Sequence, residues 1–450
     1  MHPLREKLLS CRLGLAVALA ACLCVLSAVP QDISKYRTLT NAQVAEILDT
    51  VEADIKEHYW DPGMHGFDLN KKFTEARQKI SAAKSQNEAL LYVAGAAAAL
   101  NDSHTHFIPP EAPYTVEQGW RAQIIGDSHC YVTQVLAGSD AEAQGLKRGD
   151  EIISINSVKV TPENFASIEH GYRVFLQSGF RLIVRSRDGK EREVVAMVKV
   201  VPGQQYIRRA DLMAWARAHA YDVPEDRSQY HESGHTVFWK LHDFFVQPEN
   251  IEKSLKKIRP FEAVVLDLRG NPGGSEAVMS RLVGAFFVQD VRIGESKGRK
   301  KSEPLIAKTH GQKAFGGKLV VLIDRKSSSG AEIFARVIQM EKRGVVIGDR
   351  SAGAVMEAHF FPHTISLGPT SVAHYGAMVT EANLIMADSR SLEGVGVIPD
   401  ERVLPSPVDL EVGNDPALTR AAELTGAKMS PEEAGKVFPF QWPKKMPDID

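Results

Sequence analysis

The chain has 450 residues and balances 54 Lys and Arg against 56 Asp and Glu, which gives a formal net charge of −2. Hydrophobic residues make up 44% and charged residues 24% of it, a globular composition that excludes a disordered chain and a polytopic membrane protein. Because no net basic field is present to attract phosphates, nucleic acid is excluded as the main partner. At about 150 residues per domain, the length predicts two to four domains.

The N-terminal residues 1–29 predict an export signal or a membrane anchor. Basic residues precede an uncharged apolar run at 13–29, as in a secretory signal. Cleavage near Ser27, a lipid anchor on Cys22 and an uncleaved anchor all fit this segment, so membrane association through the N-terminus stays open. The protein is expected to be exported, as a periplasmic, secreted or membrane-anchored form. Because Cys130 is the only cysteine beyond this segment, neither an intrachain disulfide nor a cysteine metal site is expected.

Residues 36–110 are predicted to form an N-terminal helical domain. Apolar residues recur at helical spacing over 44–55, and helices are also predicted over 69–80 and 87–100. Pro62 breaks the first of these helices. The pattern predicts a small helical bundle.

Residues 115–200 change character to short β-like runs between Gly and Asp turns, such as 131–135, 151–155 and 180–184. These runs predict a small β domain. The polar stretch 201–235 has few β-branched residues and is predicted to be a linker or a surface helix.

Residues 236–405 alternate predicted strands with predicted helices, which is typical of a mainly parallel sheet covered on both faces. The segment 406–450 is predicted to be a tail that holds one helix at 416–424. The whole chain is therefore expected to be an α+β multidomain protein. In 236–405, strands are expected at 236–240, 263–269, 318–324 and 344–348, and helices at 249–258, 275–287 and 330–343.

Three serines at 327–329 lie between the predicted buried strand 318–324 and a helix with apolar Ile333 and Phe334. A serine there would lie at a helix N-terminus, where free N–H groups and the helix dipole can stabilise a developing oxyanion. A nucleophile on a strand-to-helix turn uses this arrangement. The alternative is that the serines only cap the helix.

A glycine-rich turn at 270–274 follows the predicted strand 263–269. Its adjacent Gly273 and Gly274 would let the backbone approach a ligand closely. The alternatives are a simple tight turn and a phosphate-binding loop, although the Lys-Ser/Thr ending of a P-loop is missing.

Three segments together resemble the C-terminal processing, or tail-specific, proteases of serine peptidase family S41, which includes the tricorn core. They are Asp-Leu-Arg-Gly-Asn-Pro-Gly-Gly at 267–274, Ser-Ser-Ser-Gly-Ala-Glu-Ile-Phe-Ala at 327–335 and Gly-Asp-Arg-Ser-Ala-Gly at 348–353. The resemblance spans residues 36–405. It implies an N-terminal helical region, a PDZ domain and an α/β catalytic core of the ClpP/crotonase type at 236–405.

The PDZ domain, a β-sandwich or barrel-like fold, is expected at 115–200. Residues 135–141 and 145–150 are similar to the small-residue helix and Gly-Asp turn of PDZ sequences. Such domains add an extended peptide to a sheet edge and hold its terminal carboxylate. The segment near Gly119 departs from the usual Gly-Leu-Gly-Phe form of the carboxylate loop.

The resemblance places the family nucleophile on Ser329. In the Ser–Lys branch of the family a lysine is the general base, but its position here is Ala354. No lysine occurs from 343 to 427. A Ser–Lys dyad is therefore excluded within the core, and either another base serves or the protein is inactive.

The tricorn-like branch uses a histidine and a carboxylate instead. Matching its motifs implies His104 as the general base, with Ser103 and Glu393 orienting and polarising the imidazole. Imidazole suits this work because its ordinary pKa lies near neutrality, so activity is expected to fall below about pH 6 to 7. The oxyanion donors implied are the N–H groups of Gly330 and of Gly273 or a residue next to it.

Other histidines compete for these roles. His359, His363 and His374 are rivals for the base because they lie nearer to the serines in sequence, whereas His106 is expected to be structural. The segment 231–235 fits the His-Glu-x-x-His zinc pattern. That pattern works only on a helix, and here Ser and Gly fill its middle, so no metal site is expected.

The sequence therefore predicts an exported serine endopeptidase that cleaves unfolded proteins or protein C-termini through a Ser-His-Glu type centre. Its partner would be a protein or peptide substrate, presented or gated by the PDZ module. Acylation and hydrolysis at a serine need no cofactor. The alternatives are a catalytically inactive binding protein on the same fold, motivated by the missing lysine, and a zinc peptidase. The oligomeric state stays open.

Overall fold

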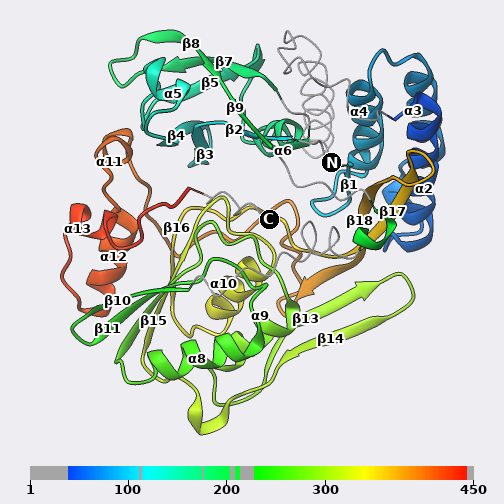
Figure 1. Ribbon diagram of the computed structural model, residues 1–450. Coiled ribbons are helices and arrows are strands. Elements are labelled where there is room, and N and C mark those ends of the chain that lie inside the picture. Colours follow the sequence, from blue (N-terminus) through cyan, green and yellow to red (C-terminus); the bar gives the residue numbers. More distant parts are fainter. Residues whose placement is uncertain (1–38, 111–113, 175–176, 203–207, 213–227, 443–450) are drawn as a thin grey trace, which may run out of the picture.

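The computed structural model describes residues 39–110, 114–174, 177–202, 208–212 and 228–442. The predicted export segment lies outside these residues. Within them, no helix is both long enough and apolar enough to span a bilayer. The expected α+β multidomain fold is confirmed: a helical region, a middle β domain and a larger α/β core lie in sequence order (Figure 1).

The predicted N-terminal helices are present, and each begins at a polar cap residue. Their apolar faces form one buried cluster. That cluster also includes Phe107, Tyr375 and Val379 from strands of the core, so the bundle is completed by a sheet rather than by its own helices. The helices are α2 (Asn41–His58), α3 (Leu69–Ala82) and α4 (Gln86–Ala97), with short 3-10 helices η2 (Met64–Gly66) and η3 (Ala98–Leu100).

The middle domain (residues 114–202) is built around an antiparallel sheet in the order β3-β4-β5-β7-β8, with β6 beside β5. Strand β3 is an edge of this sheet. A separate two-stranded ribbon pairs β2 with β9. The elements are β2 (Tyr114–Glu117), β3 (Trp120–Ile125), β4 (His129–Val135), α5 (Asp140–Ala143), β5 (Glu151–Ile155), β6 (Val158–Lys159), α6 (Phe165–Val174), β7 (Gly179–Arg185), β8 (Glu191–Met197) and β9 (Lys199–Pro202).

The core contains the expected parallel sheet, in the order β10-β11-β12-β15-β16-β19 with β10 antiparallel at its edge. Helices α8, α9 and α10 cover one face through one large apolar cluster. Helix α12 covers the other face. The elements are β10 (Gln229–Ser233), β11 (Thr236–Lys240), α8 (Pro248–Ile258), β12 (Ala263–Asp267), α9 (Glu276–Gly284), β15 (Lys318–Ile323), α10 (Gly330–Met340), β16 (Val345–Gly348) and β19 (Glu401–Arg402).

Two expectations need correction here. The predicted linker 201–235 ends in strand β10, which forms an antiparallel hairpin with β11 and packs Tyr230 against Trp239 of the core. The predicted tail 406–450 is mostly helical and packed against the core, since Ala417, Leu418 and Ala421 contact the sheet. Its helices are α11 (Pro407–Val412), α12 (Pro416–Thr425) and α13 (Pro431–Gly435).

A second core sheet was not predicted. It runs β1-β18-β13-β14, with β17 also paired to β18. Strand β1 comes from the end of the helical region, so this sheet ties that region to the core (Figure 1). Its strands are β1 (His106–Ile108), β13 (Val291–Gly298), β14 (Ser302–Ala307), β17 (Met356–Ser366) and β18 (Val372–Met386); short 3-10 helices η4 (Arg209–Asp211) and η5 (Gly311–Lys313) complete the elements.

Strands β12 and β15 are parallel neighbours. Their carboxyl ends therefore meet at one edge of the sheet, where ligands bind in open α/β folds. The chain leaves β12 through residues 268–275, the glycine turn, and leaves β15 through residues 324–330, the serine turn. These two turns carry most of the candidate site.

Candidate active site

Ser329 lies between β15 and α10, as the sequence predicts. Its backbone has φ 52° and ψ −119°, a conformation that non-glycine residues rarely adopt. Its N–H donates to the carbonyl oxygen of Ala354 at 2.8 Å and to Oε2 of Glu332 at 3.1 Å. Such strain persists only where neighbouring contacts hold it, and these bonds do so here.

Glu332 is buried beneath the serine turn and accepts several hydrogen bonds there. Its Oε1 accepts hydrogen bonds from Ser351 Oγ (2.6 Å) and Gly353 N (2.7 Å), and its Oε2 accepts one from Ala354 N (2.9 Å) in addition to that from Ser329. Burial raises the pKa of this carboxyl to about 7, although the four donors act in the opposite direction. Sequence reasoning assigned Glu332 no role; its position three residues into α10, where a capping-box Glu stands, was the available signal.

The glycine turn brings Gly273 against the serine. A Cβ on Gly273 would lie 2.6 Å from Ser329 Cβ and 2.9 Å from Gly330 N, and its φ is +91°, so only glycine fits. Its N–H donates to Asn271 Oδ1 at 2.8 Å, which corrects its expected role as an oxyanion donor. Within the described residues, the structure records no acceptor for the N–H groups of Gly274 and Gly330. These two are the candidate donors.

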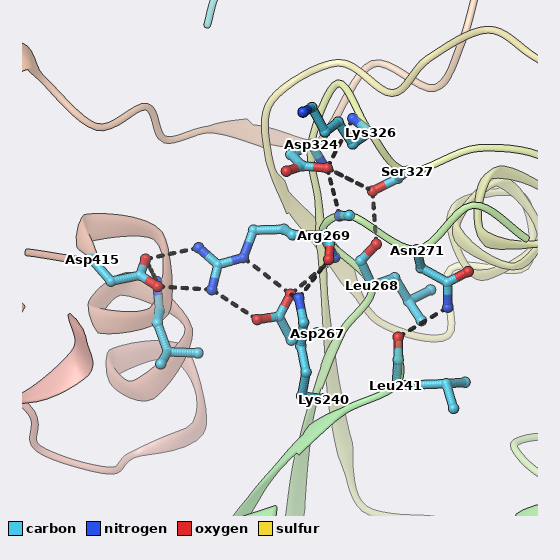
Figure 2. Close-up of polar contacts among 12 residues, drawn as sticks. Lys240, Leu241, Asp267, Leu268, Arg269, Asn271, Asp324, Lys326, Ser327 and Asp415 are labelled. Atoms are coloured by element: carbon cyan, nitrogen blue, oxygen red, sulfur yellow. Dashed lines mark hydrogen bonds and ion pairs between the residues drawn. The ribbon is translucent and has the colours of Figure 1, made fainter. Parts of the chain in front are cut away.

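An ion cluster around the buried Asp267 anchors the start of the glycine turn. Figure 2 shows the Arg269 guanidinium between the carboxylates of Asp267 and Asp415, with Lys240 beside Asp267. Arg269 donates to Asp415 Oδ1 at 2.9 Å and Oδ2 at 2.7 Å. The positive charges of Arg269 and Lys240 hold the pKa of the fully buried Asp267 well below its usual range, against the effect of burial.

Three hydrogen bonds join the glycine turn to the serine turn. Gly270 N donates to Asp324 Oδ1 at 2.8 Å, and Ser327 Oγ donates to the Leu268 carbonyl at 2.8 Å (Figure 2). Ser328 N donates to the Asn271 carbonyl at 2.9 Å. The candidate nucleophile and the candidate oxyanion donors are thereby fixed relative to each other.

The candidate base lies on a loop at 101–105, the histidine loop, between η3 and β1. Asp102 Oδ1 accepts hydrogen bonds from the N–H groups of His104 (2.9 Å) and Thr105 (2.6 Å) and from Thr380 Oγ1 (2.9 Å) on β18. This carboxylate shapes the loop and ties it to the second sheet. Its positioning role was missed at sequence level, where only the neighbouring Ser-His pair carried a motif.

Ser103 connects Glu393 to His104. Its Oγ and N–H donate to Glu393 Oε2 and Oε1, both at 2.9 Å, and His104 Nδ1 lies 2.6 Å from the same Oγ. Because the single hydroxyl proton goes to the carboxylate, Oγ accepts the proton of Nδ1. Nε2 then carries the free lone pair that a general base needs. Val355 N also donates to Glu393 Oε2 at 2.8 Å.

His104, Ser329, Gly330 and Gly274 line one cavity of about 600 Å³. Both His104 and Ser329 are described, and no hydrogen bond joins them; such bonds are often formed only once substrate is bound. Burial lowers the pKa of His104 to about 4, although the charge of Asp102 raises it. The imidazole is therefore neutral, and able to accept a proton, throughout the neutral range.

The rival histidines lie elsewhere, and none of them lines this cavity. His363 Nε2 is 2.8 Å from Asp54 Oδ2, and His374 Nε2 is 3.0 Å from the Arg208 carbonyl. His359 is exposed on β17, and His106 packs edge-on against His170. The segment 231–235 is the β10–β11 hairpin, so the helix face that the zinc pattern requires is absent there.

Two parts of the chain match known protein families. Residues 238–403 match peptidase family S41, and residues 115–167 match the PDZ domain. The chain is 22% identical to the tail-specific protease of Haemophilus influenzae over 82% of this chain and 53% of that protein. It is 28% identical to the carboxy-terminal processing protease CtpB of Bacillus subtilis over 50% of this chain and 44% of that protein. The chain thus spans about half the length of these curated relatives.

A solved structure of mature CPAF complexed with lactacystin shares the fold. It superposes with a TM-score of 0.60 over 82% of this chain and 95% of that one, at 14% identity. The helical region, the PDZ match and the S41 match follow one another in the order that the sequence motifs imply. Residues 238–403 therefore match peptidase family S41, and the PDZ match at 115–167 precedes them in the chain.

Proposed function

We propose that the protein is an exported serine endopeptidase that cleaves unfolded proteins or protein C-termini at Ser329. One observation carries the proposal: the chain Glu393–Ser103–His104 leaves Nε2 of the imidazole free in the cavity that also holds Ser329. A neutral, oriented imidazole beside a strained serine at a helix N-terminus is the arrangement that acyl transfer requires.

In this mechanism His104 Nε2 takes the Ser329 Oγ proton while Oγ attacks the scissile carbonyl carbon. The oxyanion that forms is stabilised by the N–H groups of Gly330 and Gly274, the first of them at the N-terminus of α10. The imidazolium then gives its proton to the leaving amine. A water molecule, deprotonated by the same Nε2, hydrolyses the acyl-enzyme and restores Ser329.

Ser103 and Glu393 are positioning residues in this scheme. Burial raises the pKa of Glu393, but three hydrogen bonds, two from Ser103 and one from Val355, favour its ionised form. Its charge reaches the imidazolium through the Ser103 hydroxyl. The arrangement replaces the lysine of the Ser–Lys branch, whose position, Ala354, instead supplies a carbonyl that accepts the Ser329 N–H.

The names of the two relatives, tail-specific protease and carboxy-terminal processing protease, support a protein C-terminus as substrate. The edge strand β3 of the middle domain supports docking of an extended peptide there, since PDZ domains add a strand at such an edge. Export rests on the basic and apolar pattern of residues 1–29. The inactive binding protein is disfavoured, because a fold that only binds needs no oriented imidazole.

The test uses residues 30–450, casein as an unfolded substrate, and a fluorophosphonate probe that labels activated serines. Wild type is expected to cleave casein and to carry the label on Ser329. His104→Ala should lose both cleavage and labelling. Cleavage that persists in His104→Ala would overturn the proposed base, and a wild type that neither cleaves nor labels would favour the inactive binding protein.

A further inference from the structure

The wall of the cavity around Ser329 combines apolar side chains with two acidic ones. Met279, Ile333 and Phe360 belong to the apolar part, and Glu276 and Glu357 supply the carboxylates. Glu276 stands in the first turn of α9, beside the glycine turn, and Glu357 stands on β17. Both acidic groups therefore share one cavity with the candidate nucleophile.

These two carboxylates lack a counter-charge. Among the residues that the structure describes, neither Glu276 nor Glu357 forms an ion pair, whereas a third carboxylate on the wall, Glu381, has His58 Nδ1 at 3.7 Å. Ser296 Oγ donates to Glu357 Oε2 at 2.8 Å, but Glu357 Oε1 is buried without any donor. An unpaired acceptor in such a place costs free energy that a bound donor would recover.

Burial and a neighbouring negative charge act on each of the two carboxyl groups. Burial raises the pKa of each carboxyl; the charge of Glu357 raises that of Glu276 further, and the charge of Glu303 raises that of Glu357. A cation placed between them would relieve both effects. A bare metal ion is a poor match, because hard cations need six or more oxygen ligands and most of this wall is apolar.

We propose that this cavity selects a basic residue of the substrate, Lys or Arg, next to the bond that is cleaved. The apolar wall would hold the methylene stem, and Glu276 and Glu357 would bind the charged head. The inference rests on the proposed peptidase function and names the side-chain class that this site accepts. Glu276 and Glu357 are specificity-determining residues in it and take no part in the proton transfers.

Binding can be measured without turnover by using Ser329→Ala in residues 30–450. The probes are pairs of fluorescent peptides that differ only by Lys or norleucine, with the substituted position scanned along the sequence. Norleucine keeps the stem and removes the ammonium group. All the peptides end in an amide, so that a carboxylate site on the PDZ domain contributes nothing.

At the best position, the lysine peptide should bind at least about tenfold more tightly than its norleucine partner, as expected for a partly desolvated charge pair. That ratio should fall towards one when Glu276→Gln and Glu357→Gln are added. Glu249→Gln is the matched control, because Glu249 also stands in the first turn of a core helix but does not line the cavity. It should leave the ratio unchanged.

A ratio near one in Ser329→Ala, or one that the two cavity substitutions leave intact, overturns the inference whether or not the protein is a peptidase. Because Glu276 stands in the first turn of α9 and makes no ion pair among the described residues, Glu276→Gln alone is expected to fold and should already reduce the ratio. With active protein, mass spectrometry of casein fragments gives a second readout. Cleavage without enrichment of Lys or Arg at the cut bond would overturn the inference but leave the proposed function standing. A protein that cleaves nothing would contradict the proposed function. In that case the ratio of peptide affinities still decides the inference.

Discussion

The glycine turn and the serine turn occupy equivalent places after neighbouring parallel strands, yet they are held in different ways. The glycine turn begins at a partly buried cluster of four charged side chains that includes Arg269. The serine turn is held mainly by hydrogen bonds to carbonyl groups and by one buried carboxylate, Glu332. Charged side chains thus fix the glycine turn, which offers only backbone groups to the site. Hydrogen bonds fix the serine turn, which carries the reacting side chain.

This difference fits what each turn has to do. The donors at Gly274 and Gly330 need a fixed position, because electrostatic stabilisation depends on groups that do not reorganise. The serine turn holds Ser329 at φ 52°, and its contacts must counter that strain. The Arg269 cluster stands at the start of the glycine turn, whereas Gly273, near its end, lies against Ser329.

The largest effect is expected at the serine turn itself. Ser329→Ala removes the proposed nucleophile and should lower kcat/KM on casein by about 10⁴-fold or more without changing the fold. Ser328→Ala is the neighbouring control, since the contact of Ser328 with the glycine turn is made by its backbone N–H and survives the change. Activity retained by Ser329→Ala would show that the reacting group lies elsewhere.

Arg269→Met tests the charged half of the comparison. It leaves Asp267 buried with Lys240 alone and should lower the free energy of unfolding by about 3 kcal/mol, the usual cost of breaking a buried ion pair. The measurement is denaturant unfolding followed by circular dichroism. Arg281→Met removes a partly exposed pair with Glu252 and should cost less than about 1 kcal/mol; equal losses in the two variants would contradict the anchoring role of the cluster.

Glu332→Gln tests the other half. An amide places an NH₂ group where Glu332 accepts hydrogen bonds from two donors, so activity and stability should both fall, by about 1 to 2 kcal/mol in unfolding. The pKa of Glu332 is about 7 in the folded state, which is higher than in the unfolded chain. The folded state therefore binds this proton more tightly, and the resulting contribution to the free energy of unfolding is complete below about pH 4.5. That contribution is lost as the pH rises through 7. The difference in unfolding free energy between wild type and variant should shrink over that window; a difference that grows with pH would contradict a raised pKa.

The smallest effect concerns the pH profile set by the histidine loop. With a pKa of about 4, His104 stays neutral far below pH 6.5, so the acid limb of kcat/KM should lie nearer pH 4 than the 6 to 7 expected from an ordinary imidazole. The profile should be measured from pH 3.5 to 9 alongside circular dichroism, which separates acid unfolding from titration. A midpoint at 6.5 or above would show that the imidazole is better solvated than its surroundings indicate.

Much of this fold follows from periodicity. Alternating strands and helices after residue 236 predicted the parallel sheet, because buried parallel strands are continuous apolar runs such as 319–323. The second sheet was not predicted because its strands are only partly buried. Strand β17 carries His359, Pro362 and other polar or interrupting residues, which weaken the alternation of apolar and polar side chains that indicates a strand.

The candidate site, like the fold, could be predicted from the sequence only in part. Motif order led to Ser329 and His104 as candidates, and the two residues share a cavity in the structure. It could not distinguish the N–H of Gly273 from that of Gly274, because the Asn271 side chain decides which one is occupied. Motif order also could not single out Glu332 and Asp102. The positioning role of each carboxylate depends on hydrogen-bond donors that come from distant parts of the chain.

The bond between Arg269 and Asp415 has a consequence for the order in which the protein matures. Asp415 caps α12, the helix that covers the second face of the parallel sheet, and a ribosome makes it after every residue proposed to take part in catalysis. Until that helix docks, the sheet has one bare apolar face and Arg269 lacks one of its two acidic partners. A chain in which α12 has not yet docked would therefore hold an incomplete glycine turn, and the proposed catalytic geometry would form only after that helix has been made.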